Sequence, residues 1–146
     1  MLQTQHAEVE AIFEKLGHTS DEADWRDLVG RLTDRLKMHA TLEQEIFYPA
    51  VMEVSGGADM VGHARNEHRQ VDRLVERLRE PDAMQGACAD ELRELQRIVT
   101  HHVAEEEGRM MPHARRLGLA RLRDLAQQME HRIRAGEVAE LKAAHG

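Results

Sequence analysis

The stretch HVAEE at residues 102–106 repeats the pattern of HATLE at residues 39–43. In both stretches a His is followed four positions later by a Glu, and a Pro follows that Glu after five intervening residues. A matching pattern lies upstream of each stretch, where a His begins a series of apolar residues at helical spacing: His6 in the first half and His68 in the second. The chain is therefore a duplicated unit, and each copy contributes two His and one Glu.

Apolar residues recur at helical spacing along five segments, and the composition is rich in residues that favour helix. We predict helices over residues 2–16, from the capping pattern Thr19-x-x-Glu22 to Gly56, over 58–80, from a start within 82–90 past Pro112, and over 117–142. Because proline lacks the backbone N–H of a helical hydrogen bond, Pro49 and Pro112 are predicted to kink their helices.

Two helical hairpins of similar length pack most simply as an up-down-up-down four-helix bundle. The sequence therefore predicts an all-α fold with this bundle over residues 2–115 and an accessory C-terminal helix over 117–142. A chain of 146 residues is expected to form one domain, residues 1–146.

Charge and hydropathy exclude several classes of partner. The net charge of −7 argues against a nucleic acid or an anionic membrane, because such surfaces are usually bound by basic patches. The N-terminus lacks the pattern of a signal peptide, no apolar stretch is long enough to span a membrane, and a single cysteine fits a reducing compartment. We therefore expect a cytoplasmic protein with no nucleic-acid or membrane partner.

The repeated residues have the arrangement of a metal site. On a helix, residues four apart point side by side, so His39 lies beside Glu43, and His102 beside Glu106, on stripes that otherwise carry core residues. An ionised carboxylate in an apolar core costs several kcal/mol unless a positive charge meets it. A bound cation would supply that charge.

Four imidazoles and two carboxylates suit a pair of transition-metal ions, and iron, manganese and zinc are all chemically reasonable. The symmetry of the repeat assigns three residues to each ion. The predicted ligands are His6, His39 and Glu43 for one ion, and His68, His102 and Glu106 for the other, with either Glu able to bridge.

Three further residues are weaker candidates. Glu67 adjoins His68, and His63 lies five positions before His68, which is about 140° away around a helix. Tyr48 is the only phenol, and its angular position is off the ligand-bearing face. Packing near the proline therefore competes with a role for Tyr48 as a hydrogen-bond donor or radical trap. His101 is turned about 100° from the ligand-bearing face and is predicted to face solvent.

The order His…His-x-x-x-Glu…His…His-x-x-x-Glu resembles the hemerythrin-like HHE cation-binding family, over roughly residues 2–115. The resemblance implies a four-helix bundle enclosing a non-haem di-iron centre with an oxo or hydroxo bridge. Oxygen-carrying members of that family have a fifth His four positions before the His of helix 3. Here that position is Ala64, which implies open coordination positions and two-electron redox chemistry rather than oxygen transport.

The first functional hypothesis is a di-iron protein that reacts with O2, hydrogen peroxide or nitric oxide. Catalase-like removal of peroxide, or NO detoxification, is the expected turnover. The alternative is an oxygen or iron sensor or storage protein without turnover, and a metal-free helical interaction module is a third possibility. The sequence leaves open whether the protein is an enzyme.

Overall fold

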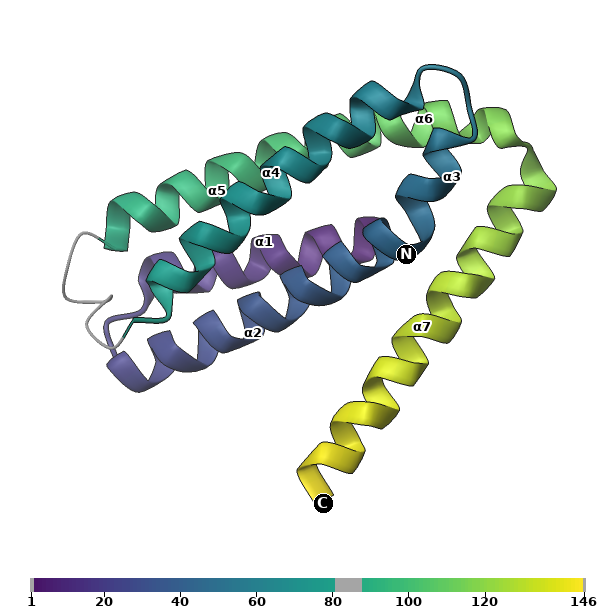
Figure 1. The fold of residues 1–146 in the computed structure, drawn as a ribbon. Coiled ribbons are helices and arrows are strands. Elements are labelled where there is room, and N and C mark those ends of the chain that lie inside the picture. The colour runs from purple at the N-terminus through teal and green to yellow at the C-terminus, as the bar shows by residue number, and fades with distance from the viewer. Residues whose placement is uncertain (1, 81–87, 146) are drawn as a thin grey trace.

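The structure, a computed structural model, describes residues 2–80 and 88–145, which are helical almost throughout (Figure 1). The main helices are α1 (Leu2–His18), α2 (Glu22–Leu42), α4 (Gly57–Leu78), α5 (Cys88–Glu105) and α7 (Leu119–His145). Short elements continue α2 and α5: the π-helical turns η1 (Glu43–Phe47) and η3 (Glu106–Met110), the helices α3 (Tyr48–Met52) and α6 (Met111–Ala114), and the 3₁₀ turn η4 (Arg115–Leu117).

The predicted all-α bundle is confirmed. Helix α1 packs along α2, and α4 packs along α5, so that the duplicated sequence forms two helical hairpins (Figure 1). The predicted helix bounds agree with the observed ones to within a few residues where the structure describes them. The predicted cap at Thr19 is wrong, because the side chain of Asp21 caps α2 by accepting from the N–H of Ala23. The predicted start of the fourth helix, within 82–90, falls partly outside the described residues.

Each proline follows a π-helical turn that begins at a predicted ligand Glu. The N–H of Tyr48 donates to the carbonyl of Glu43, and the N–H of Met111 donates to that of Glu106, which are bonds spanning five residues. A proline ring collides with the carbonyl four residues before it, so widening the helix just ahead of Pro49 and Pro112 relieves that contact. The two copies of the sequence thus share a backbone irregularity, not only a pattern of side chains.

The turn between α3 and α4 requires both of its glycines. Gly56 has a φ of 90°, in the left-handed region that favours glycine. A Cβ on Gly57 would run into the carbonyl oxygen of Val51. This close approach lets the chain reverse directly from the first hairpin into the second.

Two buried apolar clusters fill the bundle, and the predicted ligands lie between them. The first cluster lies toward the α1–α2 turn and includes Phe13, Leu32 and Leu95. The second lies toward the prolines and includes Phe47, Tyr48 and Met110. Along α2 and α5 the His and Glu residues come after the first cluster and before or within the second. The polar layer is therefore enclosed by apolar packing on both sides.

Helix α7 is the predicted accessory helix. It runs obliquely to the other helices from the proline end of the bundle and contacts η1 and α2 (Figure 1). Its Met129 is buried in the second cluster, and Arg132 forms an ion pair with Glu45 at 2.9 Å. The helix thus covers the apolar end of the bundle next to the polar layer. No helix among residues 2–80 and 88–145 is long and apolar enough to cross a membrane.

Truncation of Met129 tests whether α7 contributes to folding stability. Met129→Ala is expected to lower the free energy of unfolding by about 2–5 kcal/mol, because it leaves a cavity in the second cluster. Leu119→Ala is the matched control, since Leu119 on the same helix is 65% exposed, and its effect should stay within about 0.5 kcal/mol. Urea unfolding followed by circular dichroism measures both. Equal effects for the two variants would contradict a packing role for α7.

Candidate metal centre

The structure brings the six predicted ligands together in the middle of the bundle. Each comes from a different element, so all four bundle helices and both π-helical turns contribute one residue. Five of the six are buried, with Glu43 and Glu106 fully inaccessible to solvent, and the His68 side chain is 15% exposed. The six residues are His6, His39, Glu43, His68, His102 and Glu106.

The four imidazoles meet in two pairs through their Nε2 atoms. Nε2 of His6 lies 3.2 Å from Nε2 of His39, and the Nε2 atoms of His68 and His102 are also 3.2 Å apart. These are the pairs that the sequence repeat predicts. That each pair binds its own ion stays a prediction.

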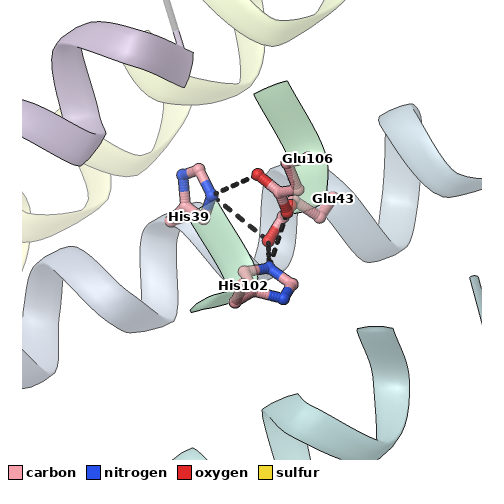
Figure 2. Close-up of side chains that lie close together, drawn as sticks. All are labelled: His39, Glu43, His102 and Glu106. Atoms are coloured by element: carbon pink, nitrogen blue, oxygen red, sulfur yellow. Dashed lines mark hydrogen bonds and ion pairs between the residues drawn. The ribbon is translucent and has the colours of Figure 1, made fainter. Parts of the chain in front are cut away.

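The two carboxylates lie between the His pairs and reach both of them. Glu106 places Oε2 at 3.1 Å from Nε2 of His6 and Oε1 at 2.6 Å from Nε2 of His102. Glu43 places Oε1 at 3.2 Å from Nε2 of His39 and 3.0 Å from Nε2 of His68. Figure 2 shows four of these side chains converging, and their ligand atoms all lie within 4.8 Å of one another. Each carboxylate is therefore shared by both His pairs.

The electrostatics of the centre fit a cation. Burial by itself raises the pKa of the Glu43 carboxyl, but the charge of His39 and hydrogen bonds from nearby His side chains outweigh it and hold that pKa well below its usual value. The second oxygen of Glu43, Oε2, is buried with no hydrogen-bond partner, which is costly for a carboxylate. A metal ion would satisfy this oxygen.

The environment of His6 also favours the state that a metal requires. Burial lowers the pKa of His6, against the opposing hydrogen bond to Glu107, and this favours the neutral ring. A neutral imidazole is the form that binds a metal ion. Nitrogen and carboxylate oxygen donors together suit iron, manganese or zinc.

The outer ring nitrogens, Nδ1, of three His residues face side-chain oxygens. The distances are 3.0 Å from His6 to Glu107, 2.8 Å from His39 to Gln5 and 3.4 Å from His102 to Glu67. Nδ1 of His68 lies 3.5 Å from the amide nitrogen of Gln44. Metal-binding His residues usually donate their second ring N–H to an oxygen, as His6, His39 and His102 can here, which fixes the ring and directs the other nitrogen at the metal. The amide nitrogen of Gln44 is a donor, so it cannot accept from His68.

The partners Gln5, Gln44 and Glu107 were not predicted from the sequence, although the repeat contains a signal for them. Gln5 and Glu67 each precede the first His of a copy by one residue. Gln44 and Glu107 each follow the Glu of a copy by one residue. A comparison of the two copies for polar neighbours in register would have found all four.

Tyr48 lies in the centre, contrary to its predicted position off the ligand-bearing face. Its hydroxyl is 3.1 Å from Nε2 of His68 and 3.4 Å from Oε1 of Glu106, and the side chain is fully buried. The prediction assumed α-helical geometry, in which Tyr48 would lie about 140° from Glu43. In a π-helical turn, residues five apart are separated by about one turn of the helix. Tyr48 therefore lies on the same face of the helix as Glu43. Burial, followed by the charge of Glu43, raises the pKa of Tyr48, so the hydroxyl keeps its proton.

The two weaker ligand candidates lie outside the central pairs. Glu67 is buried and accepts hydrogen bonds from the Nδ1 atoms of His101 and His102. It therefore helps to orient the imidazole of His102, a predicted ligand. The His63 side chain is 59% exposed, and its Nε2 lies 3.8 Å from Glu67 rather than at the centre. His101 is exposed as predicted, but it is paired with Glu67.

These features define a helical bundle with a His- and Glu-lined centre suited to metal cations. Residues 1–114 match the family model of the hemerythrin HHE cation binding domain, and the chain belongs to this family. The sequence-based resemblance is therefore confirmed. Binding by each of the individual residues, and the identity and number of the ions, stay predictions.

Two known proteins are similar to the chain. The crystal structure of a hemerythrin HHE cation binding domain-containing protein from Mycobacterium kansasii has a TM-score of 0.72 and 25% identity, covering 97% of this chain and 89% of that one. A protein of Nostoc sp. (strain PCC 7120) named DNA nickase is 27% identical over 107 residues. Those residues are 73% of this chain but 30% of the Nostoc protein, so the chain spans less than a third of that relative's length. Whether this chain has a nucleic-acid partner is untested, and its predicted absence stays a prediction.

Removal of the Glu107 carboxylate tests the role of the outer hydrogen bonds. Glu107→Ala is expected to weaken metal binding about 10–100-fold, because the imidazole of His6 loses the partner that orients it. Glu10→Ala, at an exposed position on α1, is the control and should leave the affinity unchanged. Competition of each protein with a chelator of known affinity measures the change. Equal affinities for both variants and the wild type would contradict this role.

Proposed function

We propose that the centre holds two iron ions joined by an oxo or hydroxo bridge, and that the protein disproportionates hydrogen peroxide into water and oxygen. The observation that carries the proposal is the pair of fully buried carboxylates, each within reach of both His pairs. The reaction 2 H2O2 → 2 H2O + O2 balances without another reactant. When bound, two iron ions would supply its two-electron redox chemistry.

The choice of iron rests on the redox requirement and the family resemblance. Zinc has no redox chemistry and would suit a structural or binding role instead. Manganese accepts the same nitrogen and oxygen donors. Metal analysis of the purified protein separates the three, and two irons per chain is the expected result.

A small apolar cavity on the His side of the centre supports a small substrate. Its volume is about 50 Å³, and its lining includes all four His residues together with apolar side chains. One ordered water needs roughly 10–15 Å³ of such space, so a molecule of two heavy atoms, such as hydrogen peroxide, fits. The rest of the lining is mostly apolar and includes Val9, Leu36 and Val99, together with Asp72.

Tyr48 supports the proposed reaction as a proton-bearing group. Its raised pKa keeps the phenol protonated, and its hydroxyl faces the His68–His102 pair and Glu106. In this position the phenol would donate a hydrogen bond to a peroxide oxygen held beside His68. The fully buried ring lies beside that pair, outside the lining of the cavity.

Peroxide is favoured over nitric oxide by electron balance. Reduction of two NO molecules to nitrous oxide consumes two electrons, and this requires an external donor. Disproportionation of peroxide uses one substrate molecule as the donor and another as the acceptor. NO detoxification stays the second candidate for the same centre, and sensing or storage is the alternative without turnover.

Oxygen evolution from peroxide tests the proposal. Iron-loaded protein is expected to evolve one O2 for every two H2O2 consumed, at a rate well above that of the same concentration of free iron. His39→Ala should lower both the iron content and the rate, since it removes a predicted ligand. A reversible spectral change with O2, without peroxide consumption, would overturn the proposal in favour of a sensor. Turnover of NO with an added reductant, but not of peroxide, would favour NO detoxification.

Replacement of the Tyr48 hydroxyl tests its role as a donor. Tyr48→Phe is expected to lower kcat about tenfold, because a lost hydrogen bond worth about 1.4 kcal/mol in the transition state has that effect. Iron content should stay at the wild-type value, since Phe retains the buried ring. Phe47→Leu, a change in the adjacent core residue, is the control for altered packing. An unchanged kcat in Tyr48→Phe would exclude the donor role.

A further inference from the structure

A second group of metal-ligating side chains lies at the rim of the bundle, next to the centre. His63 and Glu67 on α4 form a third His-x-x-x-Glu pair, and His101 reaches the same carboxylate from α5. Nε2 of His63 is 3.8 Å from Oε1 of Glu67, and Nδ1 of His101 is 2.8 Å from Oε2. The ligand atoms of the three residues lie within 4.8 Å of one another. We call these three residues the rim cluster.

The rim cluster is open to solvent on one side and buried on the other. The side chains of His63 and His101 are 59% and 52% exposed, whereas that of Glu67 is 9% exposed. Oε1 of Glu67 also lies 3.4 Å from Nδ1 of His102. The carboxylate of Glu67 therefore contacts both the exposed imidazoles of the rim cluster and His102, a predicted ligand of the centre.

A cavity of about 260 Å³ is lined by residues of both the rim cluster and the centre. Its lining includes His63 and Glu67 at the rim and His102 at the centre. Asp59 and Glu105 also line it, and their negative charge favours the arrival of cations. The one cation in the lining, Arg109, is paired with Glu105 at 3.2 Å. An ion held at the rim would thus lie beside a cavity that His102 also lines.

The geometry suits one transition-metal ion. Nitrogen and oxygen ligands at about 2.0–2.2 Å from a tetrahedral ion are about 3.4 Å from each other. The two distances to Glu67, 2.8 and 3.8 Å, lie on either side of that value. Small rotations of the exposed imidazoles would equalise them. Three protein ligands would leave further coordination positions to water, as in sites that exchange their ion or ligand.

We propose that His63, Glu67 and His101 form a second, exchangeable site for one divalent first-row cation, such as Fe²⁺ or Zn²⁺, beside the cavity that His63, Glu67 and His102 line. The competing explanation for the cluster is a buried carboxylate neutralised by two surface imidazoles. The proposal does not depend on peroxide chemistry or on which ions occupy the centre.

Zn²⁺ binding to the purified, metal-loaded protein tests the rim site. The double variant His63→Ala/His101→Ala retains all six central ligands and changes only exposed side chains, so it should fold like the wild type. The matched control is His18→Ala/His131→Ala, which removes two exposed His residues elsewhere. Equilibrium dialysis against Zn²⁺, with the metals of each sample counted, gives the number of ions and their affinity.

The wild type and the control are expected to bind one more Zn²⁺ per chain than the rim variant, or to bind that ion at least tenfold more tightly. Glu67→Gln should also lose this ion, because the amide carries no charge. Equal zinc numbers and affinities in the wild type and the rim variant would overturn the proposal. Loss of the ion in the control as well would place the site elsewhere. The readout is a difference between proteins with identical central ligands, so it stands apart from the test of peroxide turnover.

Discussion

The structure depends on the burial of two carboxylates, Glu43 and Glu106, at the middle of a helical bundle. Neither is accessible to solvent, and apolar clusters enclose the polar layer on both sides. Such groups are tolerated in a core only when charges and hydrogen bonds compensate for lost hydration. Four imidazoles provide part of this compensation. A metal ion would supply the partner that the Oε2 oxygen of Glu43 lacks. The packing of the helices, the placement of the ligands and the binding of a cation therefore depend on one another.

The two prolines link the backbone conformation to the placement of the buried carboxylates. Each π-helical turn begins at one of the two buried carboxylates and ends just before the residue that precedes a proline. The turn relieves the contact that the proline ring would otherwise make. It also changes which side chains point inward, and Tyr48 reaches the centre as a result. A local constraint of covalent geometry thus determines the composition of the site.

The sequence predicted the fold class and the convergence of six residues because both depend on a pattern that occurs twice. Periodicity fixed the core-facing sides of the helices, and the repeat placed His39 and His102 at equivalent positions. The predicted position of Tyr48 was wrong because the angular spacing of residues in an α-helix does not apply across a π-helical turn. The contact of His101 with Glu67 depends on how α4 and α5 pack together, and spacing along one helix contains no information about that distance.

The outer partners of the imidazoles differ between the two copies in a compensating way. Where one copy has the amide of Gln5, the other has the carboxylate of Glu67, and the amide of Gln44 corresponds to the carboxylate of Glu107. The partners are exchanged across the repeat, so each His pair has one amide and one carboxylate behind it. A carboxylate partner makes an imidazole a stronger donor than an amide does. The first copy supplies both amides and the second both carboxylates, yet the crossing of partners gives the two His pairs the same formal charge.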